Sequence, residues 1–247
     1  MNKSLENKVI LIVGAGGGVG SECALAAAKA GATVVLCGRS LPPLEKVYDA
    51  IVAAGGPEPA LFPMDLAAAV DDNYEALAQA MRMQMGRLDA IVCAASAFSA
   101  LSPLAQQTSA EWLEQFRVNA VAPFLLTQAC AGLMRQQNDA PIILLGEQHG
   151  RDAKAYWGGF AVSQAALDAW FRIQADEWSK EPALRLHLLI PGPIRSPMRN
   201  RTHPGEDRNA LPTPTELAAD ILRLLGEEGR QWRGERLEWR PGMFAPV

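Results

Sequence analysis

The chain has 247 residues, 49% of them hydrophobic, and a formal net charge of −4 at pH 7. A slightly acidic protein has no general positive field, which argues against nucleic acid or an anionic membrane surface as a partner. No apolar run approaches the roughly 20 residues that cross a bilayer, and the first residues do not resemble a signal peptide. We therefore expect a cytoplasmic protein.

Short apolar runs alternate with helix-length segments from one end of the chain to the other. The predicted strands cover residues 8–13, 33–37, 60–64, 89–94, 141–146, 185–190 and 235–239. The predicted helices cover residues 21–30, 41–54, 73–85, 109–117, 120–137, 156–180 and 215–225. Such alternation requires crossover connections, and continuous apolar strands suit a sheet buried on both faces. The prediction is one doubly wound α/β domain of Rossmann type over residues 1–247, with a parallel sheet of about seven strands.

A glycine-rich turn separates the first predicted strand from the first predicted helix. Gly14, Gly18 and Gly20 have the spacing G-x-x-x-G-x-G, which differs from the commoner G-x-G-x-x-G. Glycines allow a tight turn and close approach of the backbone to a diphosphate, which a helix N-terminus attracts. A merely flexible turn is the alternative, but its place after the first strand favours dinucleotide binding. The predicted contacts are Gly14, Gly16, Gly17, Gly18, Val19 and Gly20.

The ends of the second and third strands indicate which dinucleotide binds. An acidic residue after the second strand would bind the ribose hydroxyls of NAD, but the chain has Gly38 and Arg39 there. The planar guanidinium of Arg39 suits a 2′-phosphate, so NADP(H) is expected in preference to NAD(H). After the third strand, Asp65 could accept a hydrogen bond from the adenine amino group or could instead cap a helix.

Together these motifs resemble those of the short-chain dehydrogenases/reductases over essentially the whole chain. The glycine motif, Asp65-Leu66, Asn119 after the fourth strand and Pro191-Gly192 after the sixth all match the family pattern. The resemblance implies that Asn119 belongs to the catalytic set. It also implies pairing into dimers or tetramers through the helices 120–137 and 156–180, with Trp170 and Trp178 as candidate contacts. The further cofactor contacts that it implies are Leu66, Ala94, Ala95, Pro191, Gly192, Ile194 and Ser196.

The same resemblance places three other catalytic positions on unsuitable residues. The serine aligns with Glu147, and the tyrosine and lysine of the Tyr-x-x-x-Lys pair align with Phe160 and Gln164. In the family the tyrosine donates a proton to the carbonyl oxygen, and the lysine lowers its pKa and holds the nicotinamide ribose. Losing a general acid lowers the rate on the order of 10²–10⁴-fold. The sequence therefore predicts a degenerate family member that binds NADP(H) but has little or no ordinary oxidoreductase activity.

Two alternatives remain open at this point. The chain could be an active NADP(H)-dependent oxidoreductase in which Glu147, or His149, supplies the proton. Otherwise Glu147 could be structural, either paired with Arg151 or accepting a hydrogen bond from Gln164. A purely oligomeric role without cofactor is the third possibility. His149, Arg151 and Trp157 are predicted to line or flank the substrate pocket.

The remaining features concern a loop, the thiols and metals. Residues 191–214 are too irregular for a predicted element and form a candidate lid, and their arginines Arg195, Arg199 and Arg201 suggest a solvated surface loop. The four cysteines show no C-x-x-C pairing, so buried reduced thiols are expected. The three histidines lack metal-ligand spacing, and no structural metal is expected.

Overall fold

The short β-branched runs of the sequence form a single eight-stranded sheet. A computed structural model describes residues 4–247, and the strand order is β3-β2-β1-β4-β5-β6-β7-β8. The first seven strands pair in parallel, and β8 pairs antiparallel with β7. The strands are β1 (Val9–Val13), β2 (Thr33–Gly38), β3 (Ala60–Pro63), β4 (Ala90–Cys93), β5 (Ala140–Leu145), β6 (Leu184–Ile190), β7 (Arg236–Arg240) and β8 (Met243–Pro246).

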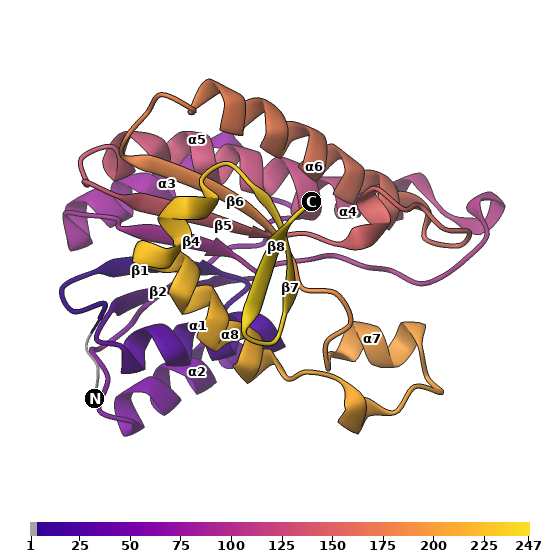
Figure 1. Cartoon of the computed structure of the whole chain (residues 1–247), viewed down its shortest axis with the longest axis horizontal. Helices are drawn as coiled ribbons and strands as arrows, with labels where there is room; N and C mark the ends of the chain where they lie inside the picture. Colours follow the sequence, from indigo (N-terminus) through magenta and orange to yellow (C-terminus); the bar gives the residue numbers. More distant parts are fainter. Residues whose placement is uncertain (1–3) are drawn as a thin grey trace.

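Helices cover both faces of this sheet (Figure 1). Those on one face are α1 (Gly18–Lys29), α2 (Leu41–Ala53) and α8 (Pro214–Leu225). Those on the other are α3 (Asp71–Ala80), α5 (Ala122–Met134) and α6 (Gly158–Glu177), while α4 (Ser109–Phe116) leads into α5 and α7 (Pro197–Thr202) lies beyond the strand ends. Two π-helical turns, η1 (Met81–Met85) and η3 (Arg117–Val121), follow α3 and α4. The short 3₁₀ turns are η2 (Leu104–Gln106), η4 (Gln148–Gly150), η5 (Arg208–Ala210) and η6 (Glu227–Trp232).

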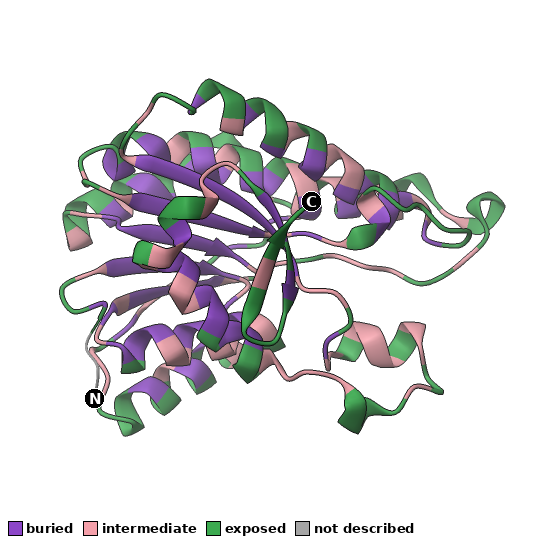
Figure 2. Ribbon diagram, viewed as in Figure 1, coloured by how far each residue is buried: buried purple, intermediate pink, exposed green. Residues whose placement is uncertain are grey.

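Alternate residues of each strand divide the core into two layers. In β1, Leu11 and Val13 pack toward α3, α5 and α6, whereas Ile10 and Ile12 pack toward α1, α2 and α8. Figure 2 shows the central strands buried, whereas β8 at the edge of the sheet and the outer sides of the helices are exposed. A sheet buried on both faces fixes the strand register, because a shift by one residue would exchange the two layers.

Side-chain caps fix the start of two helices beside the cavity. Thr108 Oγ1 accepts a hydrogen bond from the Glu111 amide at 3.2 Å, and Glu111 Oε2 accepts one from the Thr108 amide at 2.8 Å. Thr213 and Glu216 form the same reciprocal pair at the start of α8. Each pair satisfies two amide groups that a helix N-terminus would leave free.

The single α/β domain and its parallel sheet are confirmed, and several boundaries are corrected. The predicted gap between the helices 109–117 and 120–137 is bridged by η3, so the chain stays helical there. The last predicted helix before β6 begins at Gly158, after a turn in which Tyr156 has a φ of 75°. The antiparallel β8 was not predicted. The candidate lid contains α7, which starts because Ser196 Oγ caps the Arg199 amide at 3.1 Å and Pro197 favours the first turn.

Other expectations concern buried side chains. All four cysteines are unpaired and buried, as predicted, and burial raises the pKa of the Cys23 thiol to about 12. Trp178 packs into the core beneath α6, so it is not available for a subunit contact as suggested. Within residues 4–247 no helix is both long and apolar enough to cross a bilayer. In the same range, no group of three metal-ligating side chains lies close enough together to hold an ion.

Candidate active site

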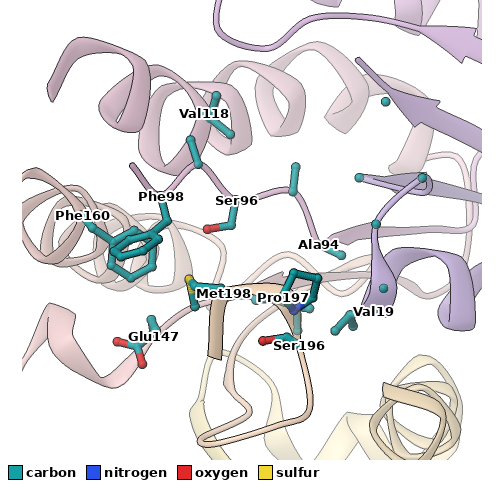
Figure 3. Close-up of a pocket in the computed structure, with 18 of the residues that line it drawn as sticks. Val19, Ala94, Ser96, Phe98, Val118, Glu147, Phe160, Ser196, Pro197 and Met198 are labelled. Atoms are coloured by element: carbon teal, nitrogen blue, oxygen red, sulfur yellow. The ribbon is translucent and has the colours of Figure 1, made fainter. Parts of the chain in front are cut away.

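A cavity of about 640 Å³ lies at the carboxyl ends of the central parallel strands. The strand order reverses between β1 and β4, and ligands of open α/β sheets bind at such a reversal. The loops after β1, β2, β3, β4, β5 and β6 all contribute to the lining. Figure 3 shows Val19 and Ala94 toward one end, and Phe98, Phe160 and Glu147 toward the other. The first end is lined mainly by backbone and small side chains, and the second by aromatic rings.

The glycine-rich turn opens the N-terminus of α1 toward this cavity. Gly14 has a φ of 83°, and a β-carbon there would lie 2.6 Å from the Ala95 amide nitrogen. A β-carbon on Gly20 would collide with the Gly14 carbonyl oxygen, whereas one on Gly18 would meet nothing within 4 Å. No side chain caps this helix, so its first amide groups are left for a ligand. The predicted residues Gly14, Gly16, Gly17, Gly18 and Val19 line the cavity.

Gly20 is therefore corrected from a cofactor contact to a packing residue. It is buried under the turn and is not part of the lining. Its lack of a side chain lets the first turn of α1 approach the Gly14 carbonyl. The role of this glycine is to shape the cradle rather than to touch what it holds.

Arg39 and Asp65 lie on the same side of the cavity as the glycine turn. Both residues line it, as does Leu66. Arg39 is exposed, and no carboxylate of residues 4–247 pairs with its guanidinium. Asp65 Oδ1 accepts a hydrogen bond from the Ala67 amide at 3.1 Å, which fixes the turn after β3. A free guanidinium beside an uncapped helix N-terminus suits a dinucleotide with an additional phosphate.

Asn119 acts on the backbone around the cavity rather than on its contents. Its Oδ1 accepts from the Ala97 amide at 2.7 Å, and its Nδ2 donates to the Ala97 carbonyl at 2.9 Å and to Ser163 Oγ at 3.0 Å. Ser163 Oγ in turn donates to the Phe160 carbonyl at 2.8 Å. Asn119 is buried and outside the cavity lining. It therefore ties the loop after β4 to the first turn of α6.

Glu147 faces the cavity and is paired with His149. Its Oε2 accepts from the His149 amide at 2.7 Å and lies 2.5 Å from His149 Nδ1. The imidazole stacks on Trp157 with ring centroids 3.8 Å apart, which holds it beneath the cavity wall. The expected partners of Glu147, Arg151 and Gln164, are thus both incorrect. The two residues stand close in sequence, and η4 folds one back onto the other.

Two of the three predicted substrate-pocket residues need correction. Trp157 lines the cavity, but His149 is covered by its ring and Arg151 points elsewhere. Arg151 Nε donates to Oδ2 of the buried Asp168 at 3.0 Å, a residue of α6 outside the cavity lining. The same carboxylate binds the buried Arg236 at 3.0 Å, so it attracts Arg151 away from the cavity.

Phe160 and Gln164 occupy the first two turns of α6 and line the cavity. Phe160 is buried and meets Phe98 edge to face, with centroids 5.3 Å apart. The Oε1 atom of Gln164 is buried and has no hydrogen-bond partner among the described residues. Buried polar atoms are normally paired, so an unpaired oxygen at a cavity wall indicates a donor supplied by a ligand. A ribose hydroxyl would be such a donor.

The turn that carries Glu147 is pressed against α6. A β-carbon on Gly150 would lie 2.8 Å from the carbonyl carbon of Gln164, so the two backbones are in direct contact. Glu147 and Gln164 are consequently held by one rigid junction.

Comparison with known proteins identifies the family. Residues 8–207 match the model of the short chain dehydrogenases. The chain belongs to the short-chain dehydrogenase/reductase family. It is 32% identical over 238 residues to the Escherichia coli K12 protein named uncharacterized oxidoreductase YciK, covering 96% of this chain and 94% of that protein.

Solved structures of the family agree with the fold. A Shigella flexneri 2a short chain dehydrogenase complexed with NADP is 31% identical, with a TM-score of 0.91, and covers 96% of this chain and 99% of that one. An Escherichia coli CFT073 relative complexed with NADPH gives the same identity and TM-score, with 96% and 98% covered. Both of these relatives are therefore complexed with a nicotinamide dinucleotide.

The residues that line the cavity fit such a dinucleotide. The uncapped α1 N-terminus and the open space over Gly18 suit a diphosphate, and Arg39 suits a further phosphate. On the opposite side, Gln164 Oε1 has no hydrogen-bond donor among the described residues. Of the other predicted contacts, Ala94, Ala95, Pro191, Gly192, Ile194 and Ser196 all line the cavity.

Phe98, Met198 and Arg201 are among the cavity residues that the sequence did not predict. Arg201 is exposed, as expected for a solvated segment, but its guanidinium carbon also lies 5.3 Å from the centroid of the Phe98 ring. Phe98 follows β4 by a few residues, in a position where loops of this fold reach the ligand. That position was a usable signal for Phe98. The sequence of a basic segment does not indicate which of its arginines contacts an aromatic ring at the cavity.

Proposed function

We propose that this protein binds NADP(H) in the cavity but does not carry out ordinary carbonyl reduction or alcohol oxidation. Phe160 carries the proposal: the family's proton donor would stand there, and its ring is buried in an aromatic cluster. A phenyl ring has neither an acidic proton to give nor a hydrogen-bond donor to hold a carbonyl oxygen. Together with the neutral Gln164, it leaves α6 without an acid or a cation facing the cavity.

The choice of NADP(H) is supported by this chain and by its relatives. Arg39 lies at the cavity without an ion-pair partner in residues 4–247, and the Shigella and Escherichia relatives are complexed with NADP and NADPH. A bound nicotinamide would supply or accept a hydride. The residues of this chain would hold the diphosphate at Gly18 and Val19, the extra phosphate at Arg39 and a ribose hydroxyl at Gln164.

Thermal unfolding with NADPH and with NADH tests the proposal. A ligand at about 100 times its Kd stabilises the folded state by roughly 2.7 kcal/mol. We expect a clear rise in Tm with NADPH and a smaller one with NADH at equal concentration. No rise with either nucleotide would contradict the proposal and leave a purely oligomeric role.

The Glu147–His149 pair favours a second candidate, an oxidoreductase with an unusual acid. A protonated Glu147 could donate into the cavity, and His149, 2.5 Å from its Oε2, could return a proton to it. Glu147→Ala would then abolish NADPH-dependent turnover, and Glu147→Gln would keep the shape but not the acid. If Glu147 is structural, any residual turnover stays largely unchanged in Glu147→Gln.

We also propose that α5 and α6 form a subunit contact, as the family resemblance implies. Phe124, Val162 and Ile173 expose apolar side chains on these two helices. Trp170 is half-buried and meets Phe124 edge to face at 6.1 Å, so it would border such a contact. Sedimentation should show a dimer or tetramer that Ile173→Lys weakens. A monomeric wild-type protein would refute the contact.

The segment 191–214 is proposed to act as a lid. Pro193, Met198 and Arg199 line the cavity from this segment, which lies beyond the strand ends in Figure 1. Bound NADPH should protect the bond after Arg208, which is exposed on this segment, from trypsin. Equal cleavage with and without nucleotide would argue against closure.

A further inference from the structure

One end of the cavity is bounded by an aromatic wall, formed by Phe98, Trp157 and Phe160. The ring centroids lie 5.3 Å apart for Phe98–Phe160, 5.6 Å for Phe98–Trp157 and 5.8 Å for Trp157–Phe160. The three rings come from the loop after β4, the turn before α6 and the first turn of α6. They support one another, so the wall exists before any ligand arrives. All three residues line the cavity.

Met198 adds a fourth apolar surface from α7. It packs against the cluster of Trp157 and Phe160 and lines the same cavity. Figure 3 shows Phe98, Phe160 and Met198 gathered at the end opposite Val19 and Ala94. The space left for a second ligand therefore has apolar surfaces on α6 and on α7. A polyol there would lose hydrogen bonds to water without replacing them.

Arg201 places a positive charge at the edge of the aromatic wall. Its guanidinium carbon lies 5.3 Å from the centroid of the Phe98 ring, and its Nη2 donates weakly to the Phe98 carbonyl at 3.4 Å. Arg199, two residues earlier, forms an ion pair with Glu206, in which Nε donates to Oε2 at 2.6 Å. Arg201 has no carboxylate partner among residues 4–247, although it lines the cavity. A guanidinium held by a ring and left without an anion is suited to bind one.

We infer that this end of the cavity binds an organic anion with a flat apolar body. The body packs on the aromatic wall and Met198, and a carboxylate or similar group binds the Arg201 guanidinium. Glu147 is at the same end, with one of its oxygens against His149 Nδ1, whereas the Arg201 guanidinium is the cation in contact with the Phe98 ring. This ligand class deepens the proposed function, because the anion would lie beside the bound nucleotide in the same cavity.

Calorimetry with three probes tests the inference: 2-naphthoate, the uncharged 2-naphthalenemethanol and acetate. We expect 2-naphthoate to bind at least about tenfold more tightly than either of the other two, corresponding to about 1.4 kcal/mol. Arg201→Gln should remove this preference while leaving the binding of 2-naphthalenemethanol unchanged. Phe98→Leu should weaken both naphthalene probes. Arg208→Gln is the matched control, since it removes a charge from the same segment outside the cavity lining.

The inference fails if 2-naphthoate binds no better than 2-naphthalenemethanol, or if Arg201→Gln and Arg208→Gln behave alike. A circular dichroism melt of each variant establishes that it is folded. NADPH binding is followed separately through its own fluorescence. Naphthoate binding that depends on Arg201, without NADPH binding, would uphold the anion site and refute the proposed function. NADPH binding without a preference for the anion would do the reverse.

Discussion

The two ends of the cavity differ in how much side-chain chemistry they require. At the nucleotide end, the glycine turn and the α1 N-terminus act through backbone, and only Arg39 contributes a charged group without a partner. At the other end, every useful group is a side chain, and Phe160 and Gln164 offer neither an acid nor a cation. Backbone cradles depend on the fold and persist with it, whereas catalytic side chains can be replaced while the fold is kept.

The largest effect is expected from restoring the family's side chains at the second end. Glu147→Ser, Phe160→Tyr and Gln164→Lys together should raise NADPH-dependent reduction of 4-nitrobenzaldehyde by about 10²-fold or more. The rate is measured by the loss of NADPH absorbance, with Phe160→Tyr alone as the control. If a well-folded triple variant gains nothing, the difference between the two ends extends beyond these three positions.

A pair of glycine substitutions tests the backbone cradle at the first end. Gly20→Ala should lower the free energy of unfolding by about 3 kcal/mol or more, because its methyl group collides with the Gly14 carbonyl. Gly18→Ala should leave that free energy within about 0.5 kcal/mol, since a β-carbon there meets nothing within 4 Å. Its methyl group should instead weaken NADPH binding. Urea denaturation and fluorescence titration measure the two quantities. Equal destabilisation by both variants would mean that the turn is not packed as described.

Arg39→Ala tests the guanidinium at the first end of the cavity. We expect NADPH to bind about 10–100-fold more weakly, as loss of a charge-assisted hydrogen bond of about 1.5–3 kcal/mol implies. NADH lacks the 2′-phosphate and serves as the internal control, so its Kd should hardly change. A parallel loss for both nucleotides would show that Arg39 supports the turn rather than reads the phosphate.

The last expected effect, on stability in acid, concerns the sheet rather than the site. Burial lowers the pKa of His187, in the middle of β6, to about 3. Between about pH 6.5 and 3 the unfolded chain therefore binds a proton that the folded chain does not. Stability is lost as the pH falls through this window, by at most about 1.4 kcal/mol per pH unit. His187→Leu should flatten the difference, measured by denaturation at several pH values. An unchanged profile would assign the acid sensitivity to other groups.

Local patterns predicted most of the sheet and the glycine turn. Period and turn chemistry depend on neighbours in sequence, so β1, α1 and the uncapped turn between them follow from residues 8–30. The partner of Glu147 could not be predicted from such local patterns. Arg151 was a candidate, but it binds Asp168, which also binds Arg236, and these residues are distant in the sequence. The position of the Arg201 side chain at the cavity depends on its contact with Phe98, about a hundred positions earlier in the sequence. Such long-range competition between charges leaves no mark in a local pattern.

Two misses had a readable cause. His149 was not predicted as the partner of Glu147, although it stands two residues away and a short turn brings their side chains together. The strand β8 is short and largely exposed, so it lacks the buried apolar run that marked the other strands. The strand is recognised only from its antiparallel pairing with β7 in the structure.

The contact between Gly150 and the Gln164 backbone has a consequence for how this chain can change over time. Residues in one packed junction show interaction energies of about 0.5–3 kcal/mol, so their substitutions do not contribute independently. We expect the effects of Glu147→Ser and Gln164→Lys to depend strongly on each other's presence. A site of the family kind could then arise only by changes made together, and single substitutions would bring little advantage for selection to keep.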